Sequence, residues 1–114
     1  MTIATVFARV SCTGLASSTA WYEKLFGEPP LRRPMPGLAE WQFSSSPEVQ
    51  LYEEKEHAGH STLTLGVLPL EPERRRPEAV GLAPGPIEKA DDFFNLRLRD
   101  PDGNLIALAS FRRT

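Results

Sequence analysis

The two side chains that most directly suggest recognition chemistry are arginines on segments of alternating character. Arg9 lies in TVFARVS and Arg97 lies in FFNLRLR. A guanidinium that points inward from a strand must meet a carboxylate, a phosphate or water. The two arginines therefore indicate one of two things. They recognise an anionic or carbonyl-bearing ligand, or they form ion pairs with Asp or Glu at a cavity rim or a dimer interface.

The stretch between residues 53 and 60 is a second candidate, because it carries side chains that bind metals. It contains three glutamates and two histidines: Glu53, Glu54, Glu56, His57 and His60. Their spacing could place two imidazoles on one helical turn, but short motifs of this kind are weak without structural context. The stretch has no hydrophobic periodicity. A solvated, charged connector is therefore the preferred interpretation, and we predict no metal site there.

A nucleophilic enzyme is poorly supported. Cys12 is the single cysteine, so there is no internal disulfide and no thiolate-rich metal site. No histidine is near it in sequence, and a lone cysteine more often serves as a small apolar core residue. We therefore assign no catalytic residue.

Composition places the chain among ordinary globular proteins. It has 114 residues, 25% of them charged, and a formal net charge of −2. This charge argues against a general nucleic-acid or anionic-membrane surface, which requires clustered Lys and Arg. No apolar run approaches bilayer length, and MTIATVFARV does not look like a signal peptide. We expect one domain, 1–114, a cytoplasmic location, and neither nucleic acid nor membrane as a partner.

The elements that must position these side chains begin with a hairpin near the end of the chain. Residues 100–104, DPDGN, combine turn-forming residues and link two alternating runs. Period-two alternation puts the large apolar side chains on one sheet face: Phe94, Leu96, Leu98, Ile106 and Leu108. The other face carries polar and small side chains, such as Asn95 and Ala107, and suggests a cavity wall.

The remaining pattern repeats once along the chain. The first half predicts a strand, an amphipathic helix ended by Gly27, and three strands: Thr2–Ser11, Leu15–Phe26, Leu31–Gly37 (an edge strand at best), Leu38–Phe43 and Glu48–Glu53. The second half predicts Ser61–Val67, a short proline-limited helix within Pro69–Ala79, Pro86–Ala90 and the hairpin. The order of elements thus indicates two modules, 1–55 and 60–114.

Two runs carry a family resemblance: GLASSTAWYEKLFG (14–27) and GPIEKADDFFNLRLRDPDGNLIAL (85–108). They resemble the vicinal oxygen chelate superfamily, which includes glyoxalases, extradiol dioxygenases, and fosfomycin- and bleomycin-resistance proteins. The resemblance implies an α+β fold in which two βαβββ modules form an open, mixed β-sheet barrel with a central cavity and the helices outside. It also implies a homodimer with two equivalent cavities.

Enzymes of that superfamily hold a divalent metal at four equivalent strand positions. In this sequence those positions match Phe7, Gln50, Thr62 and Ala107. Phenyl and methyl groups offer no donor atoms, and divalent cations need several. The resemblance therefore implies a scaffold without the metal site, and we expect no metal and no cofactor.

The alternation and the resemblance together predict a ligand cavity. Its predicted ligand-binding residues are Phe7, Arg9, Trp41, Gln50, Tyr52, Thr62, Asn95, Arg97 and Ala107. Such an aromatic and partly polar set is typical of sites for organic molecules. We expect a metal-independent protein of the glyoxalase/bleomycin-resistance type that binds an antibiotic or an aromatic or anionic metabolite. The alternatives are a lyase, isomerase or dioxygenase-like enzyme of the same superfamily, or a dimeric interaction or regulatory module without a ligand.

Overall fold

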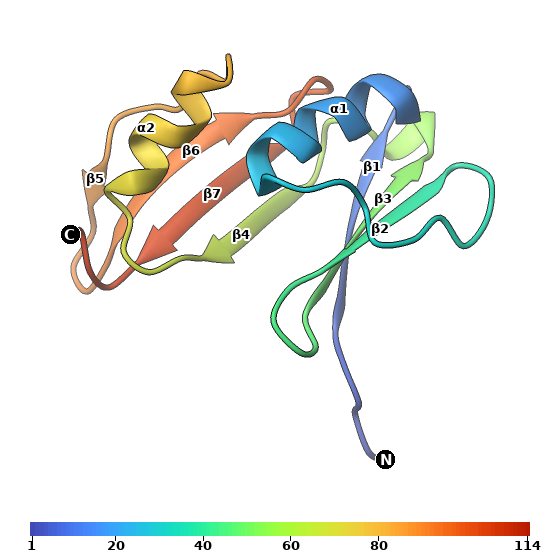
Figure 1. Cartoon of the computed structure of the whole chain (residues 1–114), viewed down its shortest axis with the longest axis horizontal. Coiled ribbons are helices and arrows are strands. Elements are labelled where there is room, and N and C mark those ends of the chain that lie inside the picture. The colour runs from blue at the N-terminus through green and yellow to red at the C-terminus, as the bar shows by residue number, and fades with distance from the viewer.

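Two β-sheets with two helices on one side of them make up the structure, a computed structural model that describes residues 1–114 (Figure 1). The first half contains β1 (Phe7–Cys12), α1 (Leu15–Phe26), β2 (Leu38–Gln42) and β3 (Glu48–Glu53). The second half contains β4 (Thr62–Gly66), α2 (Pro72–Ala79), β5 (Glu88–Lys89), β6 (Phe94–Arg99) and β7 (Leu105–Ser110). A single 3₁₀ turn, η1 (Lys55–His57), lies between the halves.

Both sheets are built in the same way. The strand order is β1-β3-β2 in the first sheet and β4-β7-β6-β5 in the second. In each sheet the first strand pairs in parallel with the last, and the other pairings are antiparallel. Each parallel pair brackets a helix-containing connection, as parallel strands require. The predicted α+β class with two repeated modules is confirmed, and the barrel that they outline is open.

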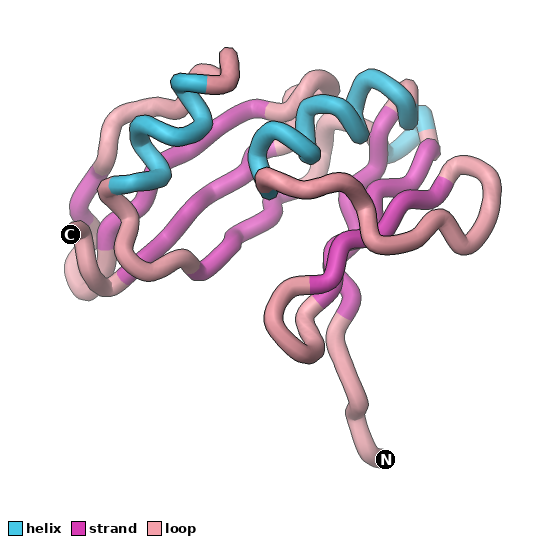
Figure 2. The backbone as a smooth tube through the Cα atoms, viewed as in Figure 1, coloured by secondary structure: helices cyan, strands magenta, loops and turns pink.

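The first sheet has one strand fewer than the sequence suggested. Residues 31–37 form only an isolated antiparallel bridge between Arg32 and Glu40. Pro34 and Pro36 explain this, since proline cannot donate to a ladder. Figure 2 shows the result as a long loop between α1 and β2.

The helices differ in how well they cover the sheets. Helix α1 has the predicted bounds and buries four of its residues, and Gly27 closes it in the left-handed conformation. Helix α2 has eight residues and buries only Pro77. The second helix is therefore short and polar, as its prolines and charges predicted.

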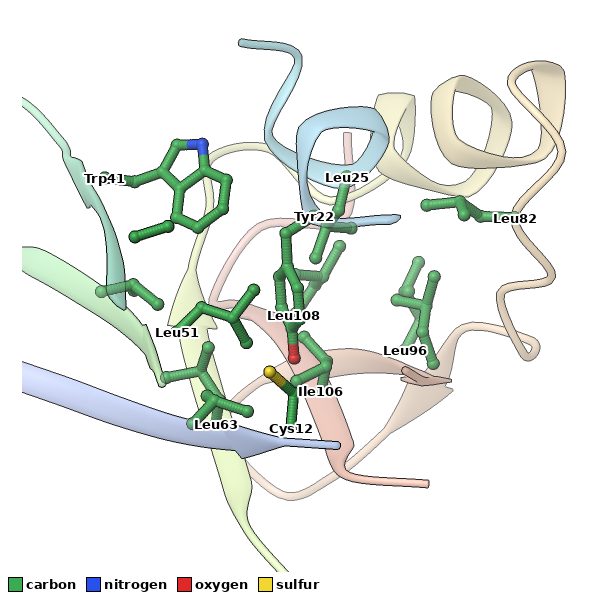
Figure 3. Close-up of a cluster of buried hydrophobic side chains, with 14 of the residues drawn as sticks. Cys12, Tyr22, Leu25, Trp41, Leu51, Leu63, Leu82, Leu96, Ile106 and Leu108 are labelled. Carbon is green, nitrogen blue, oxygen red and sulfur yellow. The ribbon is translucent and has the colours of Figure 1, made fainter. Parts of the chain in front are cut away.

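The hydrophobic core fills the helix side of both sheets. Fifteen buried residues form one cluster to which α1 and both sheets contribute. Figure 3 shows Tyr22 and Leu25 beside Leu51 of the first sheet and Leu108 of the second. Because alternate side chains point to opposite faces, most polar strand residues lie on the side away from the helices; Glu53 and Ser110 are exceptions on the helix side.

The hairpin at residues 100–104 ties the first module to the second. Asp100 is 4% exposed; its Oδ2 accepts hydrogen bonds from the Tyr22 hydroxyl at 2.6 Å and from Asn104 Nδ2 at 2.8 Å. Asn104 Nδ2 also donates to the Ser11 carbonyl, and Asn104 Oδ1 accepts from the Ser61 amide, each at 2.9 Å. This network holds α1, the end of β1 and the start of β4 to one turn.

The N-terminal residues 1–6 run outward from the body of the protein (Figure 1). Ile3 and Val6 in this segment are 71% and 69% exposed. None of the helices has the length and apolar character that crossing a bilayer would require.

Candidate functional site

The candidate site is the sheet surface that faces away from the helices, which we call the open face. On the first sheet it carries Phe7 and Arg9 of β1 with Gln50 and Tyr52 of β3. On the second sheet it carries the alternate residues of β4, β6 and β7, which are Thr62, Thr64, Gly66, Asn95, Arg97, Arg99, Leu105, Ala107 and Ala109. Eight of the nine predicted ligand-binding residues therefore lie on this face.

Register places these residues in compact groups. Arg9 pairs with Gln50 and Ser11 with Tyr52 across β1 and β3. In the second sheet, Ala107 lies between Thr64 on one side and Arg97 on the other. The open face is thus partly aromatic and partly polar, with small residues at its centre in the second sheet.

Arg9 is held on the open face by neutral groups. Its Nε donates to Gln50 Oε1 at 3.2 Å, and its guanidinium carbon lies 4.7 Å from the centre of the Tyr52 ring. Such stacking on an aromatic face stabilises a cation without neutralising it. The charge and the two terminal amino groups of Arg9 are therefore free to meet an anion.

The second sheet offers another unneutralised cation. No carboxylate lies within ion-pair distance of Arg97 or of Arg9, so the ion-pair alternative is not realised within one chain. Two residues before Arg97, the side-chain oxygen of Asn95 is buried and has no hydrogen-bond partner. A buried acceptor without a donor costs stability, so this oxygen is an energetic cost on the second sheet.

Trp41 is the exception among the predicted site residues. It lies on the helix side, is 1% exposed, and packs against Tyr22 and Phe26 with ring centres 6.2 and 5.3 Å away. Its indole N–H donates to the carbonyl of Glu28 at 3.0 Å. Trp41 is a core residue with its polar atom satisfied, and we do not carry it into the proposed site.

Three charged residues that the sequence did not single out border the open face. Glu40 and Glu48 are only 5% and 7% exposed, and the guanidinium of Arg32 bridges their carboxylates. Glu40 also accepts from Gln50 Nε2 at 2.6 Å. The alternation of Glu40 with Trp41 could have placed it here, but nothing in the irregular loop could have predicted Arg32 as its partner.

The four positions that the family resemblance matches to metal ligands lie on the open face, and their chemistry does not fit a metal ion. Phe7 and Ala107 have no donor atoms, and Thr62 has only a hydroxyl. Both ends of the Gln50 amide are engaged, by Arg9 and by Glu40. The neighbouring carboxylates of Glu40 and Glu48 are held by Arg32. A divalent cation would find too few oxygen or nitrogen ligands here.

The connector places three of its metal-binding side chains together. The ligand atoms of Glu54, Glu56 and His57 lie within 4.8 Å of one another around η1. His57 Nε2 is 3.9 Å from the Glu54 carboxylate, and the imidazole is 67% exposed. Exposed acidic groups commonly gather without binding an ion, so we keep the interpretation of a solvated connector.

Cys12 and Tyr22 are buried groups that the core keeps protonated. Burial raises the pKa of the Cys12 thiol to about 11, although a hydrogen bond with Ser18 partly opposes the increase. Burial also raises the pKa of Tyr22, and its hydrogen bond to the Asp100 carboxylate raises it further. Neither group supplies a nucleophile near neutral pH.

A cleft of about 500 Å³ lies on the other side of the sheets, between the start of β1 and β4. Its walls are mainly aliphatic and aromatic, including Val6, Phe26, Leu63 and Leu65. Arg76 borders it, but its guanidinium is bound by Glu73 and by the carbonyls of Lys24 and Leu25 at the end of α1. Two of the charged side chains at its border, Arg76 and Glu73, are thus paired with each other.

Comparison with solved structures identifies the fold. A glyoxalase/bleomycin resistance protein from Catenulispora acidiphila shares 30% identity and a TM-score of 0.85, with 93% of this chain and 96% of that chain covered. An antibiotic-binding protein from Streptomyces sp. has 19% identity and a TM-score of 0.83, with 96% and 98% covered. A lactoylglutathione lyase from Agrobacterium tumefaciens has 15% identity and a TM-score of 0.79, with 94% and 92% covered.

The sequence matches no protein-family model and no curated protein. The paired modules and these solved structures define a vicinal oxygen chelate protein. Within that superfamily, the chain belongs to the glyoxalase/bleomycin resistance family.

Proposed function

We propose that this protein binds an aromatic, anionic small molecule on its open face, without a metal ion. The observation that carries the proposal is that Arg9 and Arg97 both present guanidinium groups there with no carboxylate partner. A guanidinium recognises carboxylate or phosphate through parallel N–H donors, so an anionic ligand group is the matching partner.

The surroundings of the two arginines support an aromatic ligand. Phe7 is 47% exposed, which is a large apolar area for a strand residue with no cover. Further along the same face, Tyr52 offers a second ring, which is stacked with Arg9. One structural neighbour is an antibiotic-binding protein, which supports a small organic ligand for this fold.

We further propose that the binding form is a homodimer in which open faces of two chains enclose the ligand. Within one chain the open face has no layer over it, since both helices lie on the other side (Figure 1). Ligand sites are normally concave and bury most of the ligand. Two-fold dimers are the commonest soluble oligomers, and such pairing would cover this face.

A matched pair of probes tests the anion preference. Purified protein is titrated with an aromatic carboxylate, such as 2-naphthoate, and with its neutral methyl ester, with thermal shift and calorimetry as readouts. We expect the acid to bind at least tenfold more tightly than the ester, because charged hydrogen bonds contribute about 1.5 to 3 kcal/mol each. Equal binding of acid and ester would overturn the anionic part of the proposal.

Two arginine variants locate the site. Arg9→Gln and Arg97→Gln each keep a polar side chain but remove the charge, and we expect each to weaken binding of the acid about tenfold. Arg75→Gln is the matched control, because Arg75 is exposed on α2, outside the open face. Failure of a broad set of aromatic acids to bind would instead favour an interaction module without a ligand.

A further inference from the structure

A row of polar side chains crosses the first sheet at one level. The backbone register aligns Arg9 with Gln50, Gln50 with Glu40, and Glu40 with Arg32. Hydrogen bonds connect the same residues in the same order: Arg9 Nε to Gln50 Oε1 at 3.2 Å, Gln50 Nε2 to Glu40 Oε2 at 2.6 Å, and Arg32 Nε to Glu40 Oε1 at 2.7 Å. The loop that carries Arg32 is thereby connected to the exposed guanidinium of Arg9.

Glu40 sets the donor-to-acceptor direction of the hydrogen bonds along this row. An ionised carboxylate can only accept hydrogen bonds, so the amide of Gln50 must turn its NH₂ group toward Glu40. Its carbonyl oxygen then faces Arg9, whose guanidinium can only donate. The reversed amide would place two acceptors against each other at Glu40 and two donors against each other at Arg9. Glu40 thus determines which end of Gln50 meets Arg9.

Burial and charge pairing keep Glu40 in this role. Glu40 is 5% exposed, and Arg32 compensates its charge while also pairing with Glu48. A buried, paired carboxylate has little freedom to choose another orientation. Glu48 shares the burial and the Arg32 partner but makes no hydrogen bond to Gln50.

We infer that Glu40, clamped by Arg32, is a positioning residue that fixes the Arg9 guanidinium over Tyr52 before a ligand arrives. The expected consequence, tighter anion binding, rests on the proposed function. A pre-ordered arginine loses less side-chain entropy on binding than a mobile one. The geometric part, an ordered Arg9, holds for the free protein.

The matched variants are Glu40→Gln and Glu48→Gln. Both remove one carboxylate from Arg32 at nearly equal burial, so a general loss of stability would appear in both. Only Glu40→Gln removes the charge that fixes the Gln50 amide, because a glutamine at 40 can donate as well as accept. If Glu40→Gln does not fold, Gln50→Leu breaks the same connection while it leaves both Arg32 ion pairs in place.

The first readout needs no ligand. The Nε–Hε signal of Arg9 is followed by NMR, since stacking on Tyr52 shifts it upfield and its hydrogen bond slows exchange with water. We expect Glu40→Gln to move this signal toward that of a free arginine and to speed exchange, and Glu48→Gln to leave it in place. An unchanged Arg9 signal in Glu40→Gln, or equal changes in both variants, would overturn the inference.

The second readout is the affinity for 2-naphthoate. Glu40→Gln should weaken binding roughly three- to tenfold, the cost of ordering one long side chain, and Glu48→Gln less than twofold. In an Arg9→Gln background, Glu40→Gln should have no further effect, because it acts through Arg9. If the natural protein binds no aromatic acid, the proposed function fails while the NMR result still decides the inference. If the double variant binds 2-naphthoate more weakly than Arg9→Gln alone, the inference that Glu40 acts through Arg9 is contradicted.

Discussion

At the scale of single residues, the features that define this protein are polar atoms with and without partners. In the core, Tyr22, Asp100 and Asn104 satisfy one another in a closed network. On the open face, the guanidinium groups of Arg9 and Arg97 have no carboxylate partner. The buried network therefore contributes to stability, and the unpaired guanidinium groups are available for recognition.

Removal of the Tyr22 hydroxyl should destabilise the protein. Tyr22→Phe leaves the buried Asp100 carboxylate without one of its donors, at a cost of about 1 to 3 kcal/mol in the free energy of unfolding. Tyr52→Phe makes the same chemical change on the open face and should cost less than about 0.5 kcal/mol. Urea unfolding followed by circular dichroism measures both values. Equal losses of unfolding free energy in the two variants would show that the buried hydrogen bonds add no extra stability.

The buried thiol gives a prediction about alkaline pH. The folded-state pKa of Cys12 is raised to about 11 from the ordinary value of 9.0, so the folded state holds this proton more strongly than the unfolded state. The resulting stability is complete below pH 9 and is lost as the pH rises toward 11. Between pH 8 and pH 10 this loss amounts to about 1 kcal/mol.

Cys12→Ala should flatten that part of the stability profile. The free energy of unfolding is measured in urea at pH 8 and pH 10 for the natural protein and the variant. Burial and Asp100 raise the pKa of Tyr22 as well, but loss of its contribution begins near the ordinary tyrosine pKa of 10.0, above the ordinary cysteine pKa of 9.0, so most of that loss falls above pH 10. An equally large decrease from pH 8 to pH 10 in both proteins would contradict the assignment to Cys12.

At the scale of elements, the connector and the terminal hairpin act as one unit. Gly59 has a φ of +88°, and a Cβ atom there would lie 2.6 Å from the backbone oxygen of Asp102. The Asp102 carboxylate in turn accepts from the Thr13 hydroxyl at 2.6 Å. The hairpin is therefore held between the connector and the loop before α1.

Two glycine substitutions separate close packing from backbone strain. Gly81 has a similar φ of +91° but no atom near the position of an added Cβ. Gly81→Ala should cost about 1 to 2 kcal/mol for its φ alone. Gly59→Ala adds a clash with backbone, and we expect it to lower the free energy of unfolding by at least about 2 kcal/mol more, as overpacking does. Similar losses of unfolding free energy in the two variants would show that the connector shifts to accommodate the added methyl group at little cost.

The elements also show what the sequence could and could not predict. Helix α1 was predicted with its observed bounds because an apolar stripe, a glycine and two prolines all agree over residues 15–30. The hairpin followed from its turn residues and period-two strands. Residues 31–37 have no such pattern, so their bridge to Glu40 could not be predicted.

The sequence also predicted one part of the candidate site and not the other. Alternation alone placed Arg9, Gln50, Tyr52 and Arg97 on one side of the sheets. Trp41 does not share that side, because it alternates with Glu40 in β2 and only Glu40 lies on the face of Gln50. The Arg32 ion pairs depend on a contact between an irregular loop and a strand, which no local pattern encodes.

At the scale of the whole molecule, the open face predicts assembly. We expect sedimentation equilibrium to give twice the chain mass of 12.7 kDa at micromolar concentration, with one ligand bound per chain. The reason is that a single chain leaves the ligand-binding face without a cover. A monomer that binds the ligand with unchanged affinity would contradict the dimeric site.

The central claim is that this scaffold binds its ligand through arginines instead of a metal ion. The most direct measurement is a calorimetric titration of 2-naphthoate, or a tighter aromatic acid, into protein dialysed against a chelator and into protein supplied with Zn, Ni, Mn or Fe ions. We predict dissociation constants within twofold of each other. Binding that disappears with the chelator and returns with one stoichiometric metal would contradict the account.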